Sequence, residues 1–236
     1  NGMAGPRLVI ELPLPVRRGV GAFDRGGVPD DTLRMLDESD WPGGMQQRFR
    51  ALRPLIDRLL EGYNADFLGM LESPSDGLGV WSAENVTVSG IVTNATVPSF
   101  LKLASGGYGR RVLEPGHAMV AVNPMWTSGD DVGQLWERGL KERARDLLDA
   151  PWESLYVARV VRGARSGACG LLLRAYPHAW QLYACEDADD LSKGVGPRLL
   201  QSAERPSSEA VAAALSEHSS KKKREGGPRG FLSQFK

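Results

Sequence analysis

Apolar residues follow two patterns along this chain, and each pattern predicts one kind of element. Continuous or alternating runs rich in β-branched residues predict strands. They occur at residues 7–12, 67–71, 86–92, 118–122, 154–161, 170–175 and 180–185. Apolar residues at helical spacing predict helices. These occur at 45–63, 96–105, 126–149 and 208–218, with a shorter helix expected at 32–36. Pro54 lies inside the first helix and should kink it or begin a second segment.

The order of these elements predicts the fold class. Strands alternate with helices up to residue 149, which is typical of βαβ units and a mostly parallel sheet. The last three strands are joined by short loops and should pair antiparallel. We therefore expect an α/β fold: a mostly parallel sheet with flanking helices and an antiparallel C-terminal extension. A hydrophobic fraction of 42% in 236 residues is enough for one substantial core. Residues 1–218 should form this single domain.

Charge is unevenly distributed, and this defines a basic C-terminal interaction tail at 219–236. The tail holds six basic residues against Glu225, a net charge of +5, so residues 1–218 of this neutral chain carry −5. A basic tail on an acidic body indicates an interaction segment and argues against a nucleic-acid-binding domain. Two aromatic residues near the end could insert into a partner. The expected partner-binding residues are Lys221, Lys222, Lys223, Arg224, Arg229, Phe231 and Phe235.

No complete catalytic or metal-binding motif occurs, so we expect no catalytic residues, no metal and no cofactor. The glycine-rich segment 106–111 follows a predicted helix, whereas a phosphate loop follows a strand and opens a helix. His117, His178 and His218 have no histidine or cysteine at zinc-ligand spacing. No run reaches the roughly 18 apolar residues of a membrane-spanning helix, so membrane contact should be peripheral.

The two cysteines, Cys169 and Cys185, lie on or beside successive predicted strands. A cross-strand pair is conceivable. Two cysteines in a chain of this length are more often buried, reduced thiols in a reducing compartment.

Polar residues follow two of the predicted strands, where ligands bind in open α/β sheets. Asn94 and Thr96 follow the strand at 86–92, and Asn123 follows the strand at 118–122. The two amides could offer donor and acceptor groups to a small ligand. They could equally hold loop backbones in place, as asparagine often does.

Four segments, taken together, resemble a plastid family of otherwise uncharacterised domains found in the low-photosystem-II-accumulation proteins of plants and algae. They are 7–13, 40–44 leading into Arg48 and Phe49, 122–124 with Trp126, and 176–177 with Trp180. Residues 205–207 resemble that family's closing element. The resemblance spans residues 7 to 215.

The resemblance implies a chloroplast protein that helps to assemble or maintain photosystem II without being a permanent subunit. Our leading hypothesis is a non-enzymatic auxiliary factor at the stromal face of the thylakoid membrane. It would bind a photosystem II assembly or repair intermediate, with peripheral membrane contact and no nucleic acid. A related domain also appears fused to adenylate-kinase-like modules. The alternative is therefore a plastid enzyme that binds a nucleotide or small molecule in a cleft at the strand ends.

Overall fold

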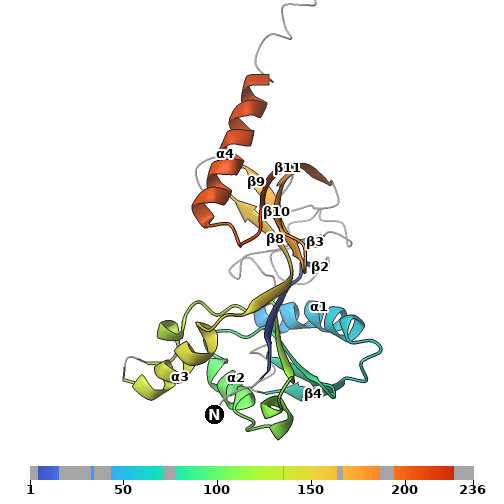
Figure 1. The fold of residues 1–236 in the computed structure, drawn as a ribbon, viewed down its shortest axis with the longest axis vertical. Helices are drawn as coiled ribbons and strands as arrows, with labels where there is room; N and C mark the ends of the chain where they lie inside the picture. The colour runs from blue at the N-terminus through green and yellow to red at the C-terminus, as the bar shows by residue number, and fades with distance from the viewer. Residues whose placement is uncertain are drawn as a thin grey trace, which may run out of the picture.

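The fold is centred on a nine-stranded mixed sheet with four helices packed along it (Figure 1). The computed structural model describes residues 5–15, 33–34, 44–71, 78–134, 136–163, 167–186 and 194–225. The strands of the large sheet run in the order β11-β10-β9-β8-β1-β7-β6-β5-β4. Their bounds are β1 Arg7–Glu11, β4 Asp66–Met70, β5 Gly79–Ser82, β6 Val86–Gly90, β7 Ala118–Val122, β8 Glu153–Arg162, β9 Cys169–Ala175, β10 Trp180–Cys185 and β11 Val195–Ser202. The helices are α1 Gly44–Leu59, α2 Val97–Ala104, α3 Arg138–Leu148 and α4 Ser208–Glu225.

The middle of the sheet is parallel. Strand β1 lies between β7 and β8 and runs parallel to both, and β6 runs parallel to β7. The connection from β6 to β7 carries α2, and the connection from β7 to β8 carries α3. Parallel neighbours need such crossovers of a dozen residues or more. The expected βαβ units are therefore present in this part of the sheet.

The expectation of a mostly parallel sheet is wrong, because only three of the eight neighbouring strand pairs described are parallel. Two described strands of this sheet, β5 and β11, were not predicted. Strand β5 is short and reaches β6 through residues 83–85, a connection that allows only a hairpin. Strand β11 contains Gly196 and Pro197, which argue against a strand except at a sheet edge, where β11 lies. Antiparallel pairs thus flank the parallel centre on both sides.

Alternation along β7 divides the core between the two faces of the sheet. Met119 packs in a cluster with residues of α2 and α3, whereas Val120 and Val122 pack in a cluster with residues of α1. A third cluster lies where α4 covers β8 to β10 and includes Leu182 and Leu215. Helices therefore cover both faces of the parallel centre, as its apolar strands require.

The helices differ from the predictions mainly at their ends. Helix α1 keeps Pro54 inside it, and α3 is shorter than the predicted helix at 126–149. In place of the helix predicted at 32–36, the structure has the strand β3 Leu33–Arg34, which pairs with β2 Leu14–Pro15. Helix α4 continues beyond residue 218, where the predicted helix ended. Among the described helices, none is long and apolar enough to cross a membrane.

Candidate functional site

The carboxyl ends of the parallel strands meet at one edge of the sheet, as the sequence predicted, and Asn123 lies there. Its side chain bonds the backbone of Leu12, which follows β1: Oδ1 accepts from the Leu12 N–H at 2.6 Å and Nδ2 donates to the Leu12 carbonyl at 2.9 Å. Asn123 has a positive φ of 48°, a conformation that asparagine tolerates better than most residues. The amide therefore extends the pairing of β1 and β7 by one more step.

Asn94 and Thr96 lie in the neighbouring loop after β6. The Asn94 amide donates to the Thr127 hydroxyl at 3.1 Å and accepts from the Thr127 N–H at 3.2 Å. The buried Thr96 hydroxyl accepts from the Thr93 N–H at 2.9 Å and lies 3.2 Å from the Thr93 carbonyl, to which it donates.

The structure thus brings the three predicted ligand-binding residues to one edge and gives each a role in holding a loop. Their side chains bond the loop after β1, the loop after β7 and the turn before α2. These contacts explain why such residues stand where parallel strands end. A ligand role for them stays a prediction.

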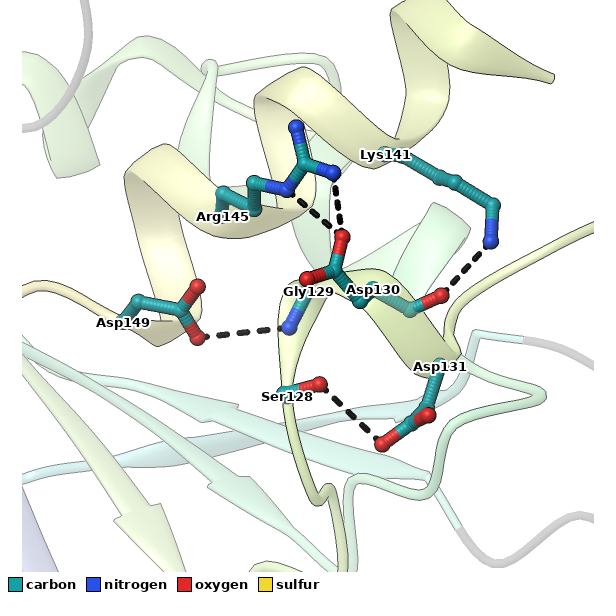
Figure 2. Close-up of polar contacts among 7 residues, drawn as sticks. All are labelled: Ser128, Gly129, Asp130, Asp131, Lys141, Arg145 and Asp149. Atoms are coloured by element: carbon teal, nitrogen blue, oxygen red, sulfur yellow. Dashed lines mark hydrogen bonds and ion pairs between the residues drawn. The ribbon is translucent and has the colours of Figure 1, made fainter.

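The loop after β7 continues into a turn that docks on α3, as Figure 2 shows. Asp130 forms an ion pair with Arg145, and its carbonyl accepts from the Lys141 ammonium at 2.6 Å. The Gly129 N–H donates to the Asp149 carboxylate at 3.2 Å, and a Cβ atom at Gly129 would lie 2.3 Å from the Arg145 backbone nitrogen. The turn therefore requires glycine at this close approach.

Asp131, which neighbours that ion pair, faces hydroxyl donors of its own loop. Thr127 and Ser128 both donate to its carboxylate, the second at 3.0 Å, and these bonds lower the pKa of Asp131. In the described part of the chain, no group of three or more histidine, cysteine, aspartate or glutamate side chains could hold a metal ion. The bonds of Asp130 to α3 and of Asp131 to its own loop hold this turn in place.

A buried carboxylate forms a second polar cluster, at the end of the central strand β1. Glu11 is the last residue of β1 and follows its apolar run. Its side chain is only 6% exposed, although it is a carboxylate. Its Oε2 lies 2.7 Å from Arg159 Nε on β8, and its Oε1 lies 3.7 Å from an Arg205 guanidinium nitrogen just before α4. Both arginine side chains are close to half exposed. One buried negative charge thus joins β1, β8 and the entry to α4.

Trp180, buried at the start of β10, extends this cluster. The guanidinium carbons of Arg205 and Arg174 lie 5.3 and 5.5 Å from the Trp180 ring centroid, within cation–π range. Arg174 also donates to the Ser154 carbonyl at 3.2 Å. Arg205 therefore links the Glu11 carboxylate to the Trp180 ring, and Arg174 lies against the same ring.

Sequence reasoning missed Glu11 as a candidate residue. The available signal was a carboxylate at the end of an apolar, buried strand, where a charge needs a partner. Its partners, Arg159 and Arg205, are about 150 and 190 residues away in sequence, and no local pattern connects them.

We expect Glu11→Gln to lower the free energy of unfolding by about 1–2 kcal/mol, because it keeps the shape but removes the charge that both arginines face. The cost stays below that of a fully buried pair because water reaches both guanidinium groups. Urea unfolding measures this change. Glu204→Gln, an exposed carboxylate beside Arg205, is the matched control. Equal unfolding midpoints for the two variants would show that the ion pairs contribute nothing.

His117 is a buried histidine at the opposite ends of the parallel strands. Its Nε2 lies 2.9 Å from the Thr87 hydroxyl, and burial lowers its pKa. A Cβ atom on Gly5 would lie 1.8 Å from the His117 carbonyl oxygen, so the chain before β1 packs tightly against this residue. We therefore assign His117 to the core.

The cationic end of α4 holds the first residues of the predicted tail. Of the α4 side chains described, which end at Lys222, Leu215 is the last buried one, and Lys221 and Lys222 are exposed. Lys221 forms an i,i+4 ion pair with Glu217 at 2.6 Å, which lowers the pKa of that carboxyl. Lys223 and Arg224 also belong to α4, but their side chains lie outside the described part, as do Arg229, Phe231 and Phe235 entirely.

Comparison with known protein families identifies one match that covers nearly the whole fold. A family described as a domain of unknown function (DUF1995) matches residues 6–217. The chain belongs to the DUF1995 family. No curated protein matches it, and no solved structure does.

Within the DUF1995 domain, three of the segments that carried the resemblance meet at Arg205, which contacts both Glu11 and Trp180. Glu11 belongs to segment 7–13, Trp180 completes the segment at 176–177, and Arg205 opens the closing element at 205–207. The family match ends at residue 217, so the cationic end of α4 follows directly after the DUF1995 domain.

Proposed function

We propose that this DUF1995 protein is a non-enzymatic auxiliary factor that binds a photosystem II assembly or repair intermediate at the stromal face of the thylakoid. The cellular setting comes from the resemblance to the low-photosystem-II-accumulation proteins. One structural observation supports a binding role and carries the proposal: α4 continues for ten residues after Leu215.

The projecting part of α4 contributes little to the core. Among the α4 side chains that the structure describes, Val211 and Leu215 are buried, and both lie in the first half of the helix. The residues after Leu215 extend the helix by about 15 Å. Figure 1 shows this part running away from the strands that α4 covers. The exposed side chains described in this part of the helix, such as Lys221 and Lys222, can contact a partner.

The positive charge at the end of α4 favours a partner with a negatively charged surface. Each lysine or arginine near an anionic surface contributes about 1 kcal/mol to binding. Salt screens this contribution over a Debye length of about 8 Å, so it favours association without giving specificity. The body, at −5, would be repelled by the same surface. The helix end and the residues after it would therefore make first contact with an acidic protein surface or anionic lipid.

Truncation after His218 tests this proposal. We expect the truncated protein to keep its melting temperature, because Val211 and Leu215 remain, and to bind isolated thylakoids much more weakly. The measurement is co-sedimentation over a range of salt concentrations, with thermal unfolding as the check on folding. Full binding by the truncated protein at every salt concentration would place the interface on the body.

Substitutions then separate the two contributions to binding. Lys221→Gln with Lys222→Gln should weaken binding roughly tenfold or more at low salt and much less at high salt. The matched control removes two exposed charges from α3, Arg138→Gln with Arg143→Gln, and should bind like the wild type. Phe231→Ala with Phe235→Ala should cause a loss that salt does not change, because apolar burial is not screened.

The photosystem assignment needs its own observation. The full chain should co-migrate with a chlorophyll-containing complex on a native gel, and the truncated chain should not. Thylakoid binding without such co-migration would support membrane contact and contradict the assignment to an assembly intermediate.

A further inference from the structure

The two cysteines of the chain lie directly opposite each other on neighbouring antiparallel strands. Cys169 is the first residue of β9, Cys185 is the last residue of β10, and the register pairs them. Both are half-buried, and neither is in a disulfide. The Cys169 thiol lies 3.2 Å from the Cys185 carbonyl oxygen, to which it donates. The sequence only suggested that a cross-strand pair was conceivable, and the register makes the two residues neighbours.

This arrangement fits the dimensions of a disulfide. Opposite residues in an antiparallel pair have Cα atoms about 4.5–5.5 Å apart. Disulfides usually join Cα atoms about 4.4–6.8 Å apart. Paired residues also project from the same face of a sheet, so both thiols lie on one face. Side-chain rotation within the existing ladder can therefore bring the sulfurs together.

The surroundings give the two thiols different reactivity. On its other side, Cys169 pairs in register with Arg162 of β8, so the Arg162 side chain starts from the same face of the sheet as the Cys169 thiol. A neighbouring positive charge favours the thiolate, which is the nucleophile in exchange. Burial and the neighbouring Cys169 raise the pKa of Cys185 to about 11. Cys169 is thus placed to react first and Cys185 second.

We propose that Cys169 and Cys185 form a reversible disulfide by exchange with an external disulfide, Cys169 attacking and Cys185 resolving. In the first step the Cys169 thiolate attacks one sulfur of the external disulfide, forms a mixed disulfide and releases the other sulfur as a thiolate. In the second step the Cys185 thiolate attacks Cys169 and releases the remaining external thiolate. Two electrons pass from the two protein thiols to the external disulfide, and their protons go to the released thiolates.

The second step is feasible despite the high pKa of Cys185. Once Cys169 is in a mixed disulfide it carries no negative charge, so one of the two causes of the raised pKa is removed and burial alone remains. The resolving thiol is also held beside its target by the ladder, which gives it a high effective concentration. The reverse reaction, with an external dithiol, reduces the pair.

Oxidised glutathione on the full-length chain tests the proposal, followed by alkylation of remaining thiols and mass measurement. The wild type should lose both alkylatable thiols, keep no glutathione and form no disulfide between chains, and excess dithiothreitol should restore both thiols. Cys185→Ser should stop at one glutathione on Cys169. Cys169→Ser should form its adduct about tenfold more slowly than Cys185→Ser, because the attacking thiolate fraction is lower.

A variant of the neighbouring arginine tests the assigned order. Loss of the neighbouring positive charge makes the Cys169 thiolate less favourable, and the higher nucleophilicity of the remaining thiolate offsets part of this loss. Arg162→Gln should therefore slow the first step about threefold. The wild type unfolded in urea provides the reference rate for unperturbed thiols. Three results would each overturn the proposal: a stable glutathione adduct on the wild type, disulfides only between chains, or equal rates for the two serine variants.

Discussion

Val120→Asp should prevent stable folding of this domain. Val120 is 6% exposed on β7, inside the sheet, and packs in the cluster that α1 covers. Aspartate there would place a carboxylate among apolar side chains, at a cost of several kcal/mol. Domains of this size are stable by only about 5–15 kcal/mol. We expect the melting temperature to fall by more than about 10 °C, or the cooperative transition to disappear. Circular dichroism during heating measures this.

Val195→Asp is the matched control for this substitution. Val195 is also a strand valine, but it lies on the edge strand β11 and is 46% exposed. Its replacement should change the free energy of unfolding by less than about 0.5 kcal/mol. If Val120→Asp and Val195→Asp melt within a few degrees of each other and of the wild type, the position of β7 in the sheet is wrong.

Asn123→Ala should lower the free energy of unfolding by about 3 kcal/mol. The substitution removes two hydrogen bonds to the Leu12 backbone, worth about 1 kcal/mol each, and puts alanine at a positive φ for about another 1 kcal/mol. Asn123→Gly should avoid only the cost of the positive φ, because glycine adopts this φ without strain, and should still lose the two hydrogen bonds. Urea unfolding of the two variants separates the backbone contribution from the hydrogen bonds.

Asn94→Ala is the comparison that distinguishes the two interpretations of these amides. The hydrogen bonds from the Asn94 amide to Thr127 are exposed. Losing them should therefore lower the free energy of unfolding by less than about 1 kcal/mol. Unchanged stability of Asn123→Ala would contradict the role in joining β1 and β7. Loss of nucleotide binding by both variants, with stability intact, would instead favour the enzyme alternative.

The sequence was most informative where a local pattern determines the structure. The apolar run at 118–122 predicted β7, because a strand that is buried on both faces requires such a run, and Val120 and Val122 are buried on it. Strand β11 could not be predicted in this way, since Gly196 and Pro197 fit a strand only at an edge, and edge position depends on the whole sheet order.

The candidate sites show the same limit. The rule that parallel strands end at one edge applies to Asn94 and Asn123, which follow the neighbouring strands β6 and β7. Their actual partners, Thr127 and Leu12, depend on loop conformations that no periodicity encodes. The Glu11 cluster depends on three distant segments of chain meeting, which only the folded structure reveals.

The attachment of α4 also affects how precisely its cationic end is positioned. The helix is fixed to the sheet through Val211 and Leu215, and its far end lies about 15 Å beyond the second of these. A rotation of 10° about this attachment displaces the far end by about 3 Å, although the buried contacts hardly move. The proposed contact with a negatively charged surface would therefore not require an exact orientation of the domain. The basic residues at the end of α4 could reach negative charges over an area several ångströms wide.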